Sequence, residues 1–409
     1  AARRRCPIAD RPSMKYALII PDGAADQPVD EFDGRTPLEA ADTPNIDRLA
    51  ALGKVGTVRN IPPGMEPGSD VAILSVLGYD PAKVYTGRAP LEAAARGLTV
   101  AGDEWVFRCN LVTIIDGIME DHSAGHITSE EAAALVAELN YRLGGDTAAF
   151  HPGVSYRQLM VLRGEGGART TPPHDILGRK ADDYLPSGRG AERLRDLIFS
   201  SRELLENHEI NAVRRDLGEN PATSIWLWGQ GKMPRLAGFK ERHGVDGAAI
   251  TAVDLVRGIS RLIGWECIDV PGATGYLDTN FAGKGAAAVK ALDDYDLVVV
   301  HVEAPDEAGH NADPEAKVQA VEQVDRHIVG PVLDRLQAGG DRWRMCVLPD
   351  HPTPCVLRSH TSDPVPFAIA GLRIPPAVVP RRLTEAAGVE GDLHIERGCD
   401  LMEYLLTVR

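Results

Sequence analysis

The sequence lacks the features that would place it in a membrane or in a disulfide-bonded class. Its longest apolar runs, such as residues 297–302, are strand-length, far short of the about 18–20 residues that span a bilayer. Its six cysteines are scattered without a C-x-x-C pair, so neither a disulfide framework nor a zinc ribbon is indicated. We therefore expect a globular protein of the reducing cytoplasm.

Positive charge is also in deficit, because 44 Lys and Arg against 59 Asp and Glu give a formal charge of −15. Such a surface repels phosphate backbones, so neither a nucleic-acid nor a membrane partner is expected. An anionic small substrate would need local arginines or bound metal. Residues 1–13 contain a run of three arginines, with a fourth at Arg11, but no apolar core of about 7–15 residues, which excludes a secretory signal. We expect them to be a disordered leader or a remnant of cloning.

Strand-length apolar runs alternate with helical patterns in two parts of the chain, residues 14–94 and 246–409. The runs KYALIIP, DLVVVHV and RMCVLP are apolar on both faces, which is typical of strands buried in a parallel sheet. Helices are predicted at 44–52, from 69 to about 77, at 252–263 and at 314–336. This alternation predicts a doubly wound, mostly parallel α/β sheet with functional groups at the carboxyl ends of its strands.

Residues 95–245 differ, because alternating strand-like segments there are combined with two helical stretches. One helix begins with a capping box, Thr128 to Glu131, and the other covers about 191–217. We expect this part to be a smaller α+β domain inserted into the sheet domain.

Side chains that bind metals follow three of the predicted strands. They are Asp22; Asp306 and His310; and Asp350 and His351, with His360 further along. Mixed carboxylates and imidazoles suit Mn²⁺ or Zn²⁺, and suit Mg²⁺ less well. Six ligands are too many for one ion that must also bind substrate, so we predict two divalent ions, as in phosphoryl transfer. Taken singly, each residue could be a turn former or part of a solvated helix face.

Ser69 adds a candidate nucleophile in the segment Pro67-Gly68-Ser69-Asp70. It stands at a predicted helix start, where free N–H groups and the helix dipole favour an anion. Metal coordination would lower the pKa of its hydroxyl. Spacing alone favours the simpler interpretation that this serine caps its helix.

A set of motifs in this order resembles the alkaline phosphatase superfamily. The motifs are PDG at 21–23, TPLEAADTPNIDRLA at 36–50, PGSD at 67–70, YTGRAPLEA at 85–93, GATG-x2-DTN at 272–280, APDEAGH at 304–310 and PDHPTPC at 349–355. More narrowly, they resemble the archaeal-type cofactor-independent phosphoglycerate mutases, a branch that also occurs in bacteria. The resemblance runs from about Lys15 to the C-terminus.

The resemblance implies how the ligands divide. One manganese or zinc ion would be held by Asp22, Ser69, Asp350 and His351, and the other by Asp306, His310 and His360. Ser69 would be phosphorylated by 3-phosphoglycerate, and the reoriented glycerate would take the phosphoryl group back as 2-phosphoglycerate. No 2,3-bisphosphoglycerate would be needed. The inserted domain would act as a lid that holds glycerate and excludes water.

Basic residues supply the candidates for holding the substrate. They are His122, His126, Arg157 and Lys232 in the insert, and Arg88 in the sheet domain. Each could instead be ordinary surface polarity, and Arg88 could pair with Glu92 one helical turn away.

Three positions depart from the archaeal mutase pattern. Those enzymes carry arginines where this chain has His122 and His126, and another arginine where it has Trp228. Losing guanidinium groups removes bidentate clamps for carboxylate or phosphate. In this respect the chain resembles a bacterial subgroup proposed to act as homoserine kinases.

Four functions therefore compete. An isomerase that interconverts phosphoglycerates is favoured over a homoserine-kinase-like phosphotransferase, whose substrate would carry less negative charge. A phosphohydrolase would need an insert too loose to exclude water. A non-catalytic, metal-stabilised binding protein would tolerate Ser69→Ala. A homo-oligomer is possible for any of them.

Overall fold

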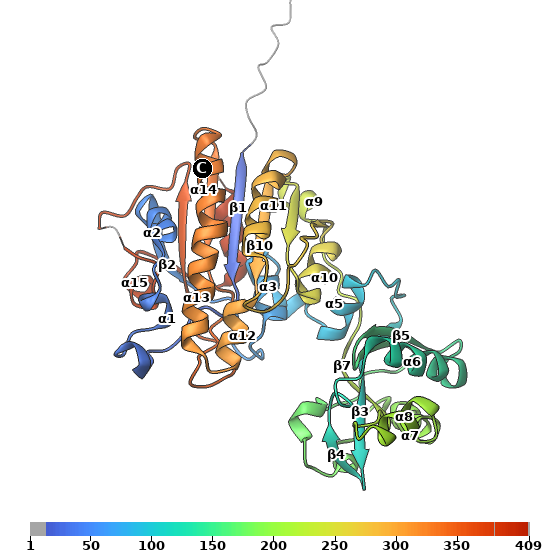
Figure 1. The fold of residues 1–409 in the computed structure, drawn as a ribbon. Helices are drawn as coiled ribbons and strands as arrows, with labels where there is room; N and C mark the ends of the chain where they lie inside the picture. The colour runs from blue at the N-terminus through green and yellow to red at the C-terminus, as the bar shows by residue number, and fades with distance from the viewer. Residues whose placement is uncertain (1–13, 380, 408–409) are drawn as a thin grey trace, which may run out of the picture. The chain divides into compact units, whose positions relative to one another are not determined.

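The computed structural model describes residues 14–379 and 381–407, so the expectation for residues 1–13 lies outside the described part. The chain forms two compact units (Figure 1). Among the described residues, the first unit comprises those up to Val84 and from Leu236 onward, and the second comprises Tyr85–Arg235. The sequence analysis predicts these boundaries after residues 94 and 245, whereas the two compact units divide after Val84 and Arg235.

Two short helices account for the difference. Helix α5 (Arg88–Ala95) packs on strands of the second unit, where Ala89 and Ala93 contact Val106 and Leu159. Helix α9 (Phe239–His243) belongs to the first unit, because the Phe239 ring lies 4.6 Å from that of Trp265.

The first unit is built on an eight-stranded sheet with the order β13-β2-β12-β11-β1-β10-β8-β9. The strands are β1 (Lys15–Pro21), β2 (Gly53–Val58), β8 (Gly247–Ile250), β9 (Glu266–Cys267), β10 (Leu297–Val302), β11 (Trp343–Val347), β12 (Val365–Gly371) and β13 (Leu393–Ile395). All described pairings are parallel except those of β12, which runs antiparallel to β11 and β2. The mostly parallel sheet is as predicted.

Helices cover both faces of this sheet, as doubly wound topology requires. In β1, Ala17 and Ile19 pack into the core under α2, α11, α13 and α14, whereas Tyr16 points to the other face and donates a hydrogen bond to Leu406 O beside α16. The helices are α1 (Pro37–Ala40), α2 (Pro44–Ala51), α3 (Ser69–Val76), α4 (Pro81–Val84), α9, α10 (Asp254–Leu262), α11 (Phe281–Asp294), α12 (Ala304–His310), α13 (Pro314–Val324), α14 (Gly330–Ala338), α15 (Glu385–Val389) and α16 (Leu401–Leu406), with short helical turns η1 (Asp30–Phe32), η4 (Asp325–Val329) and η5 (Gly398–Asp400).

The predicted helix at 314–336 is interrupted, because a π-helical turn at η4 joins α13 to α14. Its Asp325 carboxylate accepts hydrogen bonds from the backbone N–H groups of Asn45 and Ile46, at 3.3 and 2.6 Å. These are free N–H groups of the first turn of α2, whose N-cap residue Thr43 makes no side-chain cap. A distant carboxylate therefore caps this helix.

The second unit has a five-stranded antiparallel sheet with the order β4-β3-β6-β5, and β7 pairs with β3. Its elements are α5, β3 (Glu104–Ile115), β4 (Ile118–Asp121), α6 (Ser129–Leu143), β5 (Ala148–Val154), β6 (Arg157–Arg163), η2 (Pro173–Ile176), η3 (Ala181–Tyr184), α7 (Ala191–Glu206), α8 (Glu209–Asp216) and β7 (Ser224–Gly231). The predicted capping box is present, because Thr128 and Glu131 exchange both hydrogen bonds at the start of α6.

Alternation along β3 separates the two faces of this sheet. Phe107, Cys109 and Leu111 pack under α6 and α7, so the residues between them face the other way. Arg108 and Asn110 thus lie on the face not covered by these two helices. In the described part of the chain, no helix is long and apolar enough to cross a membrane.

Candidate functional site

Three neighbouring strands carry the predicted metal ligands. In the first unit β1 lies between β10 and β11 and is parallel to both, so their carboxyl ends meet at one edge of the sheet. Asp22 directly follows β1, Asp306 lies in α12 after β10, and Asp350 follows β11. The fold therefore brings together the three clusters that the sequence analysis selected.

Asp22, Asp350 and His351 form a fully buried group. The Asp350 Oδ1 atom accepts hydrogen bonds from the backbone N–H groups of Gly23 and His351, at 3.2 and 3.0 Å. The Nε2 atom of His351 lies 3.5 Å from Asp22 Oδ1 and 3.5 Å from Asp350 Oδ2. One oxygen of Asp350 is thus held by the backbone while the other points into the group.

Ser69 joins this group through its hydroxyl. It is the first residue of α3, and the N-cap residue, Gly68, has no side chain that could cap the helix. Instead its Oγ donates a hydrogen bond to Asp22 Oδ2 at 3.4 Å and lies 3.1 Å from His351 Nε2. The interpretation of Ser69 as a cap is wrong, because the hydroxyl points toward the ligand cluster.

Asp306, His310 and His360 form the second group. The Nε2 atoms of the two histidines are 2.9 Å apart, and they lie 3.2 and 3.4 Å from the carboxylate oxygens of Asp306. Burial opposes ionisation of Asp306, yet hydrogen bonds from both histidines hold its pKa well below the usual range. The Asp306 carboxylate raises the pKa of His310 to about 9.

The chemistry of the first group fits a bound cation. Asp22 Oδ1 and Asp350 Oδ2 are buried and accept no hydrogen bond from any described residue. Burial, followed by the charges of Asp350 and Asp306, raises the pKa of Asp22 well above its usual range. Neutralising converging buried carboxylates is what a divalent ion does. Ligand atoms lie within 4.8 Å of one another in the sets Asp22, Asp350, His351; Asp306, His351, His360; and Asp22, His301, Glu303.

The last of these sets contains residues that the sequence analysis missed. The Nε2 atom of His301 lies 2.9 Å from Asp22 Oδ2. Nearby, the buried Lys284 donates a hydrogen bond to His301 O at 3.3 Å, and burial lowers its pKa to about 8. Glu303 was within reach of the strand-end argument, because it directly follows β10. His301 and Lys284 lie inside an apolar strand and a helix, where no local pattern singles them out.

In the second unit, three of the predicted substrate-binding residues surround Tyr156. The ring centroids of His122 and His126 lie 5.6 and 6.2 Å from that of Tyr156, and the Arg157 guanidinium lies 5.8 Å from it. His126 has a positive φ of 50°, which is uncommon outside glycine.

A second aromatic residue, Trp228, extends this cluster. The His174 ring lies 5.3 Å from Trp228 and 6.1 Å from His122, while the Arg108 guanidinium lies 4.3 Å over the indole. Trp228 donates a hydrogen bond from its Nε1 to Asn110 Oδ1 at 3.0 Å, which fixes the ring. The sequence analysis missed Arg108, Tyr156 and His174, because they lie on separate segments.

The sequence analysis places Arg88 in the sheet domain, and this is wrong. Arg88 belongs to the second unit, which also contains this cluster. It starts α5, and its Nε lies 3.9 Å from Glu92 Oε1, while Arg108 Nε lies 3.2 Å from the same oxygen. Lys232 contacts a different ring, with its Nζ 5.3 Å from that of Trp105. We call Arg88, Arg108, His122, His126, Tyr156, Arg157, His174 and Trp228 the basic–aromatic cluster.

The electrostatics of the basic–aromatic cluster favour an anion. Burial and the neighbouring His122, Arg108 and Arg88 hold the pKa of His174 below its usual value, although Asp175 opposes them. Burial likewise lowers the pKa of Arg108, with Arg88 among the contributing cations and Glu92 opposing. Gathering like charges on one face is costly unless a negatively charged ligand offsets it.

Comparison with known proteins identifies the family. A profile described as 2,3-bisphosphoglycerate-independent phosphoglycerate mutase matches residues 50–211. Proteins named 2,3-bisphosphoglycerate-independent phosphoglycerate mutase from Methanothrix thermoacetophila and Methanosarcina barkeri are 49% and 48% identical, over 96% and 97% of this chain and 100% of each relative. The chain belongs to the cofactor-independent phosphoglycerate mutase family. The resemblance drawn from the motifs is therefore confirmed.

Other relatives of this mutase family agree with that assignment. A protein of Geobacter sulfurreducens named as a probable mutase of the same kind is 47% identical over 96% of this chain and 100% of its own length. The solved structure of the PH0037 protein of Pyrococcus horikoshii has a TM-score of 0.81, 32% identity and 96% coverage of both chains. A cofactor-independent phosphoglycerate mutase from Thermoplasma acidophilum has a TM-score of 0.65 and 27% identity, with 96% and 98% covered.

The structure brings together the three positions at which the sequence analysis expects a departure from the archaeal pattern. His122, His126 and Trp228 are far apart in sequence but lie in the one basic–aromatic cluster, linked through His174 and Tyr156. The cluster retains the guanidinium groups of Arg88, Arg108 and Arg157. The three positions thus lie in one patch of the second unit.

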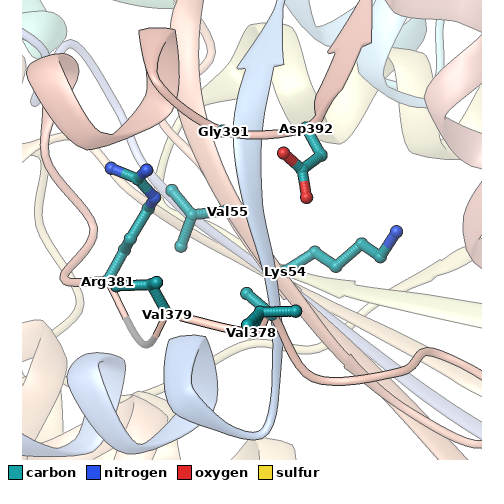
Figure 2. Close-up of a pocket in the computed structure, with 8 residues that line it drawn as sticks. Lys54, Val55, Val378, Val379, Arg381, Gly391 and Asp392 are labelled. Atoms are coloured by element: carbon teal, nitrogen blue, oxygen red, sulfur yellow. The ribbon is translucent and has the colours of Figure 1, made fainter.

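A separate pocket at the edge of the first sheet takes no part in this chemistry. Figure 2 shows Lys54 and Val55 of β2 beside Val378, Val379 and Arg381. Its volume is about 120 Å³, which is below the about 300–1,000 Å³ typical of ligand sites. Its lining contains no serine, cysteine or histidine, so the carboxylate–histidine groups beside Ser69 remain the candidate site.

Proposed function

We propose that this protein interconverts 3-phosphoglycerate and 2-phosphoglycerate through a phosphoserine intermediate at Ser69. The observation that carries the proposal is the position of the Ser69 hydroxyl, which starts a helix, caps nothing and points into a buried carboxylate–imidazole cluster. The names of the relatives, at 47–49% identity over nearly the whole chain, support the substrate.

Two divalent ions are part of the proposal, with Mn²⁺ preferred and Zn²⁺ or Mg²⁺ as alternatives. Asp22, Ser69, Asp350 and His351 would hold one, and Asp306, His310 and His360 the other. Bound there, such ions would neutralise phosphoryl oxygens and lower the pKa of the serine hydroxyl. No 2,3-bisphosphoglycerate is required.

The residues of the chain then perform the transfer. The Ser69 Oγ attacks phosphorus, the bond to the glycerate oxygen breaks, and the glycerate takes the phosphoryl group back on its other hydroxyl. The positive end of the α3 helix dipole favours the negative phosphoryl group beside Ser69, the first residue of that helix. The basic–aromatic cluster would hold the substrate's carboxylate, and the second unit would act as a lid that excludes water.

A cytoplasmic location is also proposed. The five cysteines in the described part of the chain are all free, which suits a reducing compartment. The relatives' names favour the mutase over a homoserine-kinase-like phosphotransferase or a phosphohydrolase.

A phosphorus NMR time course tests the proposal. Metal-loaded protein is mixed with 3-phosphoglycerate without 2,3-bisphosphoglycerate, beside Ser69→Ala and a control, Ser200→Ala, at a half-buried serine of α7. We expect a 2-phosphoglycerate signal in wild type and control, and a loss of about 10³-fold or more in Ser69→Ala. Inorganic phosphate would instead indicate a hydrolase. Turnover only with homoserine and a phosphoryl donor would indicate the kinase.

A further inference from the structure

Thr353 lies between the two ligand groups and belongs to neither. It is fully buried in the segment that follows Asp350 and His351. Its hydroxyl donates a 2.5 Å hydrogen bond to Asp306 Oδ1 and lies 3.2 Å from His351 Nδ1. One hydroxyl therefore touches a ligand of each proposed metal.

The direction of these hydrogen bonds determines which nitrogen of His351 is free. An ionised carboxylate only accepts, so the hydroxyl hydrogen of Thr353 goes to Asp306. Its oxygen then accepts from His351, which requires the hydrogen of that ring on Nδ1. Pro352 O lies 3.3 Å from the same Nδ1 and favours the same tautomer. The Nε2 lone pair is left facing Ser69, Asp22 and Asp350, where a metal would bind.

The backbone of Thr353 is held at both ends. Its N–H donates to Ala25 O at 3.1 Å, and its carbonyl accepts from Lys317 Nζ at 2.7 Å. Lys317 is itself paired with Asp26 at 2.7 Å, with both side chains fully buried. The position of the Thr353 hydroxyl is thus fixed by hydrogen bonds of its own backbone, and does not depend only on its contacts with Asp306 and His351.

A glycine makes room for this arrangement. A Cβ atom on Gly23 would lie 2.6 Å from Thr353 Oγ1 and 2.5 Å from Asp306 Oδ1, and its φ of +62° favours glycine. The PDG motif therefore supplies Asp22 as a ligand and, in the next residue, the space through which Thr353 reaches Asp306.

We propose that Thr353 is a positioning residue that couples the two metal-binding groups, orienting Asp306 and His351 with a single hydroxyl. Ordering one group orders the other, so metal uptake is cooperative. This inference rests on the metal centre of the proposed function. Outer-shell hydrogen bonds of this kind change metal affinity by about 10–100-fold.

Calorimetric titration of metal-free protein with Mn²⁺ tests the inference. The variants are Thr353→Val, which keeps the shape but removes the hydroxyl, and Thr353→Ser, which keeps the hydroxyl. The control is Thr57→Val, at a second threonine 2.8 Å from a histidine nitrogen but on β2, away from the cluster. Thermal unfolding of each metal-free variant verifies folding.

We expect Thr353→Val to weaken Mn²⁺ binding about 10–100-fold and to abolish its cooperativity, whereas Thr353→Ser should keep both the affinity and the cooperativity of wild type. In nitrogen NMR of metal-free protein, the His351 Nδ1–H signal should persist in the serine variant and weaken in the valine variant. The inference is overturned if Thr353→Val binds Mn²⁺ as wild type does, or if Thr353→Ser loses affinity and cooperativity as Thr353→Val does. It is also overturned if wild type binds no Mn²⁺. Cooperative Mn²⁺ binding without mutase activity would refute the proposed function and support the coupling.

Discussion

Replacing Lys317 with methionine should destabilise the first unit strongly, because it leaves a buried carboxylate without its cation. The Lys317 Nζ–Asp26 Oδ2 distance is 2.7 Å, and both side chains are fully buried. Removing one partner of a buried ion pair costs about 3–5 kcal/mol. We expect a loss toward the lower end, about 3 kcal/mol, because Asp26 still accepts hydrogen bonds from the backbone N–H groups of Gln27 and Cys355.

Urea unfolding measures this loss, and the structure offers a matched control. Lys240 and Asp246 have the same 2.7 Å separation, but their side chains are 71% and 42% exposed, so Lys240→Met should lower the free energy of unfolding far less than Lys317→Met does. Hydrogen exchange of residues 350–360 should quicken in Lys317→Met, because Lys317 holds the Thr353 carbonyl. A double-mutant cycle with Asp26→Asn isolates the pair. Equal losses at Lys317 and Lys240 would refute the reasoning.

Three further predictions concern pH and binding. Burial alone would raise the pKa of Asp121, but hydrogen bonds from Ser123, Asn220 and Gly125 outweigh it and lower the pKa to about 2. Its contribution to stability is therefore complete above the unfolded value near 3.9 and lost as pH falls toward 2, so Asp121→Asn should flatten acid unfolding followed by circular dichroism. Burial raises the pKa of Tyr79 to about 12, with Arg242 opposing. The contribution of Tyr79 is complete below about 10 and lost as pH rises through 12, so Tyr79→Phe should remove that alkaline slope. Arg108→Met should raise KM for 3-phosphoglycerate about tenfold or more, while Arg163→Met, at the far end of β6, leaves it unchanged in steady-state assays.

The metal-binding half of the site was largely predictable from sequence, for a topological reason. Strands buried on both faces are recognisable from composition, and the carboxyl ends of parallel strands share one edge. The ligand residues that follow β1, β10 and β11 must therefore lie near each other, because these three strands are neighbours in the sheet. The strand order itself has no local signature. The direction of the Ser69 hydroxyl is equally non-local, since it depends on His351, which lies far along the chain.

The basic–aromatic cluster shows where such reasoning stops. Alternation along β3 places Arg108 and Asn110 on one face, but nothing local shows that Trp228 of β7 lies beneath Arg108 or that His174 reaches both Trp228 and His122. The error in the first domain boundary has the same origin. From sequence alone, the alanine face of α5 could pack on either domain. Its contact with Val106 and Leu159, which assigns it to the second unit, is visible only in the fold. Residues that repeat a chemical type after successive strands are detectable from sequence. Residues whose role comes from convergence of unrelated segments, such as Thr353 between Asp306 and His351, need the fold.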